Sequence, residues 1–178
     1  METRAGETVS VETQEDLQKA LDDHVAVINV IQTVGDGEWS DQGFLESSDY
    51  EWKEFRIDYA VEITSNATGE NREIWYSWFT VESGGSLTLS GNLFVNGNIQ
   101  GWTHHPLDCI TVEAGGSLSV RDHAQILSDG GTALVGHQKP EGIAVVIEGG
   151  TATIDTLSRI EGSSGGLLIT EEGGTCTI

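Results

Sequence analysis

Short runs of alternating apolar and polar residues, separated by Gly-Gly pairs, dominate the second half of the chain. Four of the pairs lie in segments that align with one another; they begin at residues 84, 115, 149 and 173 and are 31, 34 and 24 residues apart. Each unit reads as a strand, a glycine corner and a second strand, with side chains alternating at period 2. A repeat of roughly 20 to 30 residues whose length varies in one loop is typical of a solenoid. The aligned segments are 79–89, 110–120, 144–154 and 168–178.

The apolar positions of these units align in columns, and a third strand beyond each corner adds another column. Each unit alone buries little, so stacked units must close one another's apolar faces. We therefore predict an all-β fold, a right-handed parallel β-helix (solenoid). Cys109 and Cys176 fall at different repeat positions, which argues against a disulfide between them. The columns are Leu87, Leu118, Ala152 and Cys176; Leu89, Val120, Ile154 and Ile178; and Val95, Ile126 and Ile160.

The N-terminal region departs from the repeat. Thr13 is followed three residues later by Asp16, which is a helix-start pattern, and apolar residues recur at i, i+3 and i+4 from Leu17. A continuous apolar run, 25–31, follows and reads as a buried strand. We predict that residues 8–24 form a cap with a short N-terminal helix that covers one end of the solenoid.

Residues 35–54 interrupt the strand pattern, and we predict an inserted loop there. The alternation resumes at 55–63. A length of 178 residues suits a single domain, which we place at 1–178. The residues after Met1 are polar and do not form a signal peptide, so we expect the chain to be a fragment of a larger secreted protein.

The order of these features is specific enough to indicate a family. A helix containing Asp-Leu-Gln-Lys-Ala-Leu, then a buried strand, then Val-Glu-x-Gly-Gly-Ser-Leu-x-Leu units resembles bacterial surface and adhesin-type proteins with a pectin-lyase-like right-handed parallel β-helix. The resemblance covers residues 8–178 apart from 35–54. It implies an extracellular or cell-surface location and contact with glycans or host surface proteins. The same fold carries many activities, so the motifs specify function poorly.

The charge balance excludes two classes of partner. Acidic residues outnumber basic ones 29 to 8, which gives a formal net charge of −21. Such a surface repels nucleic-acid phosphates and anionic membranes, so we expect neither nucleic-acid binding nor membrane insertion. The charge also keeps an exposed domain soluble, which is its simplest explanation. No apolar run approaches the roughly 20 residues that a membrane-spanning helix needs.

Tryptophans concentrate where the repeat is interrupted. Indole faces beside carboxylates are common in sugar recognition, because they combine apolar stacking with hydrogen bonds to hydroxyl groups. The structural alternative is that the loops that carry them fold back as a lid on the end of the solenoid. As ligand-binding candidates we predict Trp39, Trp52, Trp75 and Trp102.

Histidines lie in two loops that the repeat register makes neighbours. The loop 97–108 carries His104, His105 and Asp108, and the equivalent loop of the next unit carries His137. Imidazole and carboxylate groups that converge could hold a divalent cation. Apart from such a cation, we predict no cofactor. The alternative is that these side chains are exposed and solvated.

Catalytic groups do not recur along the repeat. The best local trio is Arg121, Asp122 and His123, which also reads as a solvated corner with an ion pair. We therefore predict no enzymatic activity and a non-catalytic extracellular binding or adhesion module. The alternative from another class is a polysaccharide-degrading β-helix enzyme, a lyase or a hydrolase.

Hydroxyl side chains flank one apolar column in every unit. Strands stacked about 4.8 Å apart would arrange them as a flat ladder, which points to ice binding as a third function. The simpler interpretation is that Ser and Thr suit an exposed strand face. The ladder consists of Ser86, Thr88, Ser117, Ser119, Thr151, Thr153, Thr175 and Thr177.

The last unit ends directly after a strand. An open end exposes unpaired strand edges, so we expect either a continuation past Ile178 or end-to-end self-association there.

Overall fold

The computed structural model describes residues 4–35, 53–69, 71–75, 77–97, 108–128, 143–162 and 165–178. This part of the chain is mostly β-structure, with one helix, and all pairings between its named strands are parallel. The prediction of an all-β fold with parallel strands is confirmed. The one helix described is too short to cross a membrane.

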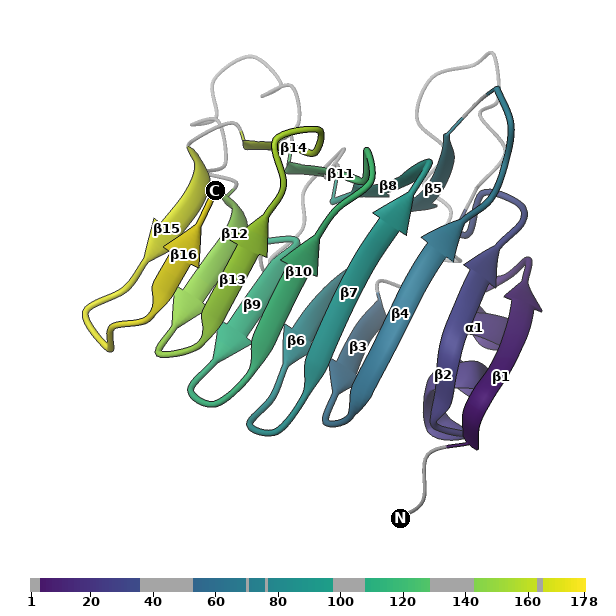
Figure 1. Ribbon diagram of the computed structural model, residues 1–178, viewed down its shortest axis with the longest axis horizontal. Helices are drawn as coiled ribbons and strands as arrows, with labels where there is room; N and C mark the ends of the chain where they lie inside the picture. Colours follow the sequence, from purple (N-terminus) through teal and green to yellow (C-terminus); the bar gives the residue numbers. More distant parts are fainter. Residues whose placement is uncertain are drawn as a thin grey trace, which may run out of the picture.

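The strands form three sheets (Figure 1). The seven-stranded sheet contains, in spatial order, β1 (Arg4–Val11), β2 (Val25–Val30), β4 (Ala60–Ser65), β7 (Ser86–Gly91), β10 (Ser117–Val120), β13 (Thr151–Ile154) and β16 (Thr175–Thr177). The four-stranded sheet contains β14 (Arg159–Gly162), β11 (Gln125–Ser128), β8 (Leu93–Asn96) and β5 (Arg72–Trp75). The five-stranded sheet contains β15 (Gly165–Ile169), β12 (Ile143–Glu148), β9 (Ile110–Glu113), β6 (Ser77–Val81) and β3 (Lys53–Ile57).

From β3 to β16 the chain visits the sheets in one fixed order: five-stranded, seven-stranded, four-stranded. We call one such passage a layer. Strand neighbours within a sheet are therefore equivalent strands of successive layers, as the repeat predicts. The register confirms two complete columns and most of a third; Ile178 follows the end of β16 and is 82% exposed. The confirmed columns are Leu87, Leu118, Ala152 and Cys176; Leu89, Val120 and Ile154; and Val95, Ile126 and Ile160.

Inward side chains of the three sheets form one hydrophobic core. The aromatic rings of Phe55 and Phe79, on neighbouring strands of the five-stranded sheet, lie 5.3 Å apart at their centroids and are both buried. Aliphatic residues of the columns fill the rest of the core. The period-2 alternation seen in the sequence thus divides each strand into a core side and an outward side.

The Gly-Gly pairs solve two separate steric problems. The first glycine of each pair has a left-handed backbone, with φ of +86° at Gly84 and +83° at Gly115. The second approaches the preceding layer so closely that a Cβ on Gly85 would lie 2.0 Å from the carbonyl oxygen of Ile57. A Cβ on Gly116 would lie 2.6 Å from the carbonyl oxygen of Val81. The pair therefore permits both the sharp corner and the close stacking of layers.

The helix predicted near the N-terminus is α1 (Gln14–Asp22), and it packs against β1, β2 and β3. Thr13 caps it as predicted, because its Oγ1 accepts a hydrogen bond of 3.1 Å from the backbone N–H of Asp16. Its predicted apolar face is buried. The sequence did not indicate that β1 pairs with β2 and joins the seven-stranded sheet.

The segment 55–63, which reads as one alternating run, is divided between β3 and β4 in different sheets. The corner falls at Asp58 and Tyr59, and the Tyr59 hydroxyl donates a hydrogen bond of 3.3 Å to the carbonyl oxygen of Val25. Apolar alternation continues across this corner without a glycine, so the pattern did not mark it. Of the predicted loop 35–54, residues 53 and 54 belong to β3, and residues 36–52 lie outside the described part.

Substitution of the two glycines of one pair should have unequal effects. Gly85→Ala should lower the free energy of unfolding by about 1–3 kcal/mol or more, because its Cβ would overlap the Ile57 carbonyl of the preceding layer. Gly84→Asn should cost about 1 kcal/mol or less, since asparagine tolerates a left-handed backbone and nothing lies within 4 Å of that Cβ. Urea denaturation of both variants measures the difference. Equal losses would contradict the close-approach role of the second glycine.

Candidate functional site

The structure describes two of the residues predicted to form sites, Trp75 and Asp108. The other predicted ligand-binding tryptophans and the predicted metal-binding histidines lie outside the described residues. These are Trp39, Trp52, Trp102, His104, His105 and His137. A candidate site can therefore be built around Trp75.

Trp75 lies at the end of β5 and points away from the core. Its neighbour Ile74 is fully buried in the core, so Glu73 and Trp75 share the outward side of the strand. The indole N–H of Trp75 donates to the Glu73 carboxylate. The side-chain amide of Asn96 on β8 lies 3.4 Å from the same carboxylate oxygen. The ring of Trp75 is thus oriented by a carboxylate, which is in turn contacted by a buried amide.

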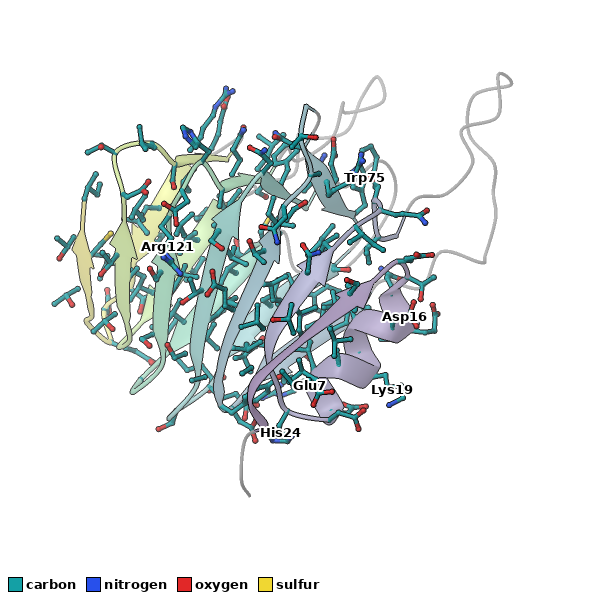
Figure 2. All side chains as sticks on the ribbon, turned by 45° about the vertical axis from the view of Figure 1, so that its right-hand side comes forward. Glu7, Asp16, Lys19, His24, Trp75 and Arg121 are labelled. Atoms are coloured by element: carbon teal, nitrogen blue, oxygen red, sulfur yellow. The ribbon has the colours of Figure 1, made fainter. Side chains whose placement is uncertain are left out.

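The backbone that carries Trp75 is also held from several directions. Its N–H donates to the carbonyl oxygen of Val34 at 2.9 Å. Its carbonyl oxygen accepts from Gln14 Nε2 of α1 at 3.2 Å and from Ser77 Oγ at 2.9 Å. Figure 2 shows Trp75 at the opposite edge of the molecule from His24, which follows the C-terminal end of α1. The strand, a side chain of the helix and the start of β6 therefore fix the position of the indole.

The outward residues of the four-stranded sheet continue from Trp75 across three more strands. We call them the Trp75 face. Three of its side chains are half-buried: the ring of Phe94, the amide of Gln125 and the aliphatic Leu127. One row of the face contains Glu73, Phe94, Gln125 and Arg159, and the other contains Trp75, Asn96, Leu127 and Glu161. Aromatic and apolar surface thus alternates with hydrogen-bonding groups.

Sequence reasoning identified Trp75 but missed the rest of this face. The signal was present, since Val95 and Ile126 were aligned as an inward column, and their flanking residues must then point outward. Arg159 and Glu161 at the far end form an exposed ion pair. Such a pair contributes about 0–1 kcal/mol to stability. Within the described part of the face, Arg159 is the single cationic side chain beside two carboxylates.

The predicted hydroxyl ladder is present on the outward side of the seven-stranded sheet, and we call it the Ser/Thr face. Its hydroxyls pair in register across four strands: Ser86, Ser117, Thr151 and Thr175 in one row, and Thr88, Ser119, Thr153 and Thr177 in the other. The threonines of β13 and β16 are exposed, whereas the residues of these two rows on β7 and β10 are half-buried. On β4 the rows continue as Ala60 and Glu62, so the ladder ends there.

Arg121, Asp122 and His123 form a corner stabilised by charges. Arg121 contacts the Glu62 carboxylate at 2.9 Å and Asp122 at 3.3 Å. Asp122 and His123 both adopt left-handed backbones, with φ of 56° and 75°. The carboxylate of Asp155 on the next layer accepts from the backbone N–H of Asp122 at 2.7 Å. A hydrogen bond from Ser158, followed by that of Asp122, lowers the pKa of Asp155. These contacts give Arg121 and Asp122 a structural role at the corner.

Arg121 and Trp75 lie well apart in Figure 2, and the corner instead leads directly into β11, the third strand of the Trp75 face.

Asp108 is half-buried beside the five-stranded sheet. Burial raises the pKa of its carboxyl group, and a backbone hydrogen bond to Ile143 partly opposes the shift. Among the described residues, no group of three or more His, Cys, Asp or Glu side chains is placed to hold a metal ion. Since the three histidines of the predicted cluster lie outside this part of the chain, their site stays a prediction.

The two cysteines are free. Cys109 is buried, its thiol donates to the carbonyl oxygen of Leu127 at 3.1 Å, and burial raises its pKa to about 12. Cys176 lies in the last layer and is partly exposed, and burial raises the pKa of this thiol as well. Neither environment favours a thiolate, so these side chains serve packing.

Comparisons with protein family models, with characterised proteins and with solved structures find no match to this chain. The candidate site therefore rests on its own geometry.

The cysteines should differ in their reaction with a disulfide reagent such as Ellman's reagent. At about pH 8 the partly exposed Cys176 of the folded protein should react and release reagent anion. Cys109 should react only when the protein unfolds, because burial shields its thiol and opposes formation of the reactive thiolate. The absorbance of the released anion, in native buffer and in denaturant, measures the reaction of each thiol. Cys176→Ser should remove the reaction of the folded protein. A fast reaction that persists in this variant would contradict the burial of Cys109.

Proposed function

We propose that this protein is a non-catalytic extracellular binding module that contacts glycans through the Trp75 face. The observation that carries the proposal is the outward indole of Trp75, held by Glu73 and bordered by further aromatic and amide side chains. A rigid aromatic surface beside hydrogen-bonding groups suits a sugar ring, which has apolar C–H faces and polar edges. The carboxylates of the face already have partners in the structure, which favours binding over acid–base chemistry.

We further propose that the three sheets are the sides of a right-handed parallel β-helix. The fixed order in which the chain visits the sheets and the in-register pairing of equivalent strands support this fold. Parallel strands joined by crossovers are right-handed in nearly all proteins. The α1 helix then lies at the N-terminal end as the predicted cap.

The proposed location is the cell surface or the extracellular medium, and the proposed partners are glycans or host surface proteins. The resemblance of the repeat to surface and adhesin-type proteins supports this location. The net charge of −21 keeps such an exposed module soluble and makes nucleic acids poor partners.

Removal of the Trp75 ring tests the proposal directly. Trp75→Ala should weaken binding to a glycan on an array by at least about tenfold, because truncation of a central aromatic anchor removes its stacking surface. Titration calorimetry with the glycan found on the array gives the dissociation constant.

The matched control is Trp75→Phe, which keeps a stacking ring and loses the hydrogen bond to Glu73. It should bind the glycan more tightly than Trp75→Ala and more weakly than the wild-type protein, because the ring remains but Glu73 no longer holds it. Thermal unfolding must show that both variants stay folded. Failure of the wild-type protein to bind any glycan of a broad array would overturn the proposed function.

The Ser/Thr face supports a second candidate function, binding to ice or to another regular surface. The in-register rows of hydroxyls favour it, since strand spacing sets a repeat of about 4.8 Å across the strands and about 6.8 Å along them. A flat, periodic array of this kind can match a crystal lattice at many points at once.

Thermal hysteresis of ice growth tests the second candidate. Thr153 lies between Ser119 and Thr177 in its row. Thr153→Tyr should abolish hysteresis because the ring disrupts the flat face, whereas Thr153→Val, which keeps the shape, should retain it. Absence of hysteresis in the wild-type protein, or its survival in the tyrosine variant, would exclude this function.

A further inference from the structure

We infer that the ligand of the Trp75 face is a linear, uncharged glycan that lies across β5, β8 and β11, and that Glu73 is the residue that positions the Trp75 ring for it. This inference rests on the proposed function and specifies its ligand class.

The direction of the ligand follows from the register. Side chains of the Trp75 face repeat from strand to strand, so their rows cross the strands. Trp75 and Phe94 offer rings on neighbouring strands, and Gln125 follows Phe94 on the next strand. Two strand spacings amount to roughly 10 Å, so a disaccharide that stacks on Trp75 ends short of Gln125 and a third sugar is needed to reach it. A linear chain that stacks on Trp75 can therefore reach Gln125 only if it crosses the strands.

Glu73 is suited to position the ring because a second side chain also contacts its carboxylate. Its carboxylate accepts from the Trp75 indole, and the amide of Asn96, which is 6% exposed, lies 3.4 Å away. The indole N–H is thereby committed to the protein, which leaves the ring face as the surface that Trp75 contributes to a ligand. An oriented ring loses less conformational entropy on binding than a free one.

The charge of the face selects against acidic glycans. Glu73 and Glu161 stand on it, the cation Arg159 is paired with Glu161, and the whole chain carries −21. Each carboxylate of a uronate chain would be repelled by this negative charge. The described part of the face offers no unpaired cation to attract it. Neutral sugars avoid the repulsion and still use hydrogen bonds to amides and carboxylates.

The experiment compares oligosaccharides of increasing length, from disaccharide to hexasaccharide, in neutral series of glucose, galactose and mannose and in uronate series of galacturonate and mannuronate. Affinities come from titration calorimetry at low and high salt. We expect binding to a neutral series that changes little with salt, since screening affects only charged partners. Gln125→Ala should weaken the longer chains by roughly fivefold and leave the disaccharide unchanged, whereas Phe94→Ala should weaken both.

Two results overturn the inference and leave the proposed function standing: preference for a uronate series, or an effect of Gln125→Ala that is the same for all lengths. Binding to no series overturns the inference, and absence of binding to the broad array as well overturns the proposed function.

The role of Glu73 is tested by a pair of variants. Glu73→Ala should weaken binding of every neutral length by roughly tenfold, and Glu73→Gln, whose amide oxygen can still accept from the indole, should restore most of it. A purely structural role would change the unfolding midpoint without this rescue of affinity. Equal affinity of the alanine variant and the wild-type protein would exclude the positioning role.

Discussion

Close stacking of equivalent strands is the constraint on which the rest of this structure depends. Every layer pairs in register with the next, and at the Gly-Gly corners the layers can approach because the second glycine has no side chain. A Cβ on Gly85 would lie 2.0 Å from a carbonyl oxygen of the preceding layer. Once this contact is made, the apolar columns meet in the interior, and each layer buries the open side of its neighbour.

The outward faces are consequences of the same register. Because side chains alternate, any residue type that recurs beside an inward column becomes a row across a sheet. The Ser/Thr face is such a row, and it is regular because its four strands belong to repeated corners. The Trp75 face is less regular. It begins at the strand that α1 supports through Gln14, and it holds different residue types on each strand.

Prediction succeeded where the repeat was explicit and failed where the chain turned without a marker. Glycine pairs located the corners, and the columns of Leu118 and Ile126 had the expected partners. The corner at Asp58 and Tyr59 was missed, because apolar alternation runs through it. The β1 strand was missed as well, since its pairing with β2 lies outside the repeat.

The sequence by itself determined the alternation, the equivalence of layers, the capped helix and the hydroxyl rows, because each depends on spacing along the chain. Only the tertiary structure decided which side chains meet across layers. Asn96 reaches Glu73 over 23 residues and Arg121 reaches Glu62 over 59. Segments of variable length separate these partners, so their contacts depend on the stacking of layers and on the direction of each side chain, which a periodic pattern does not encode.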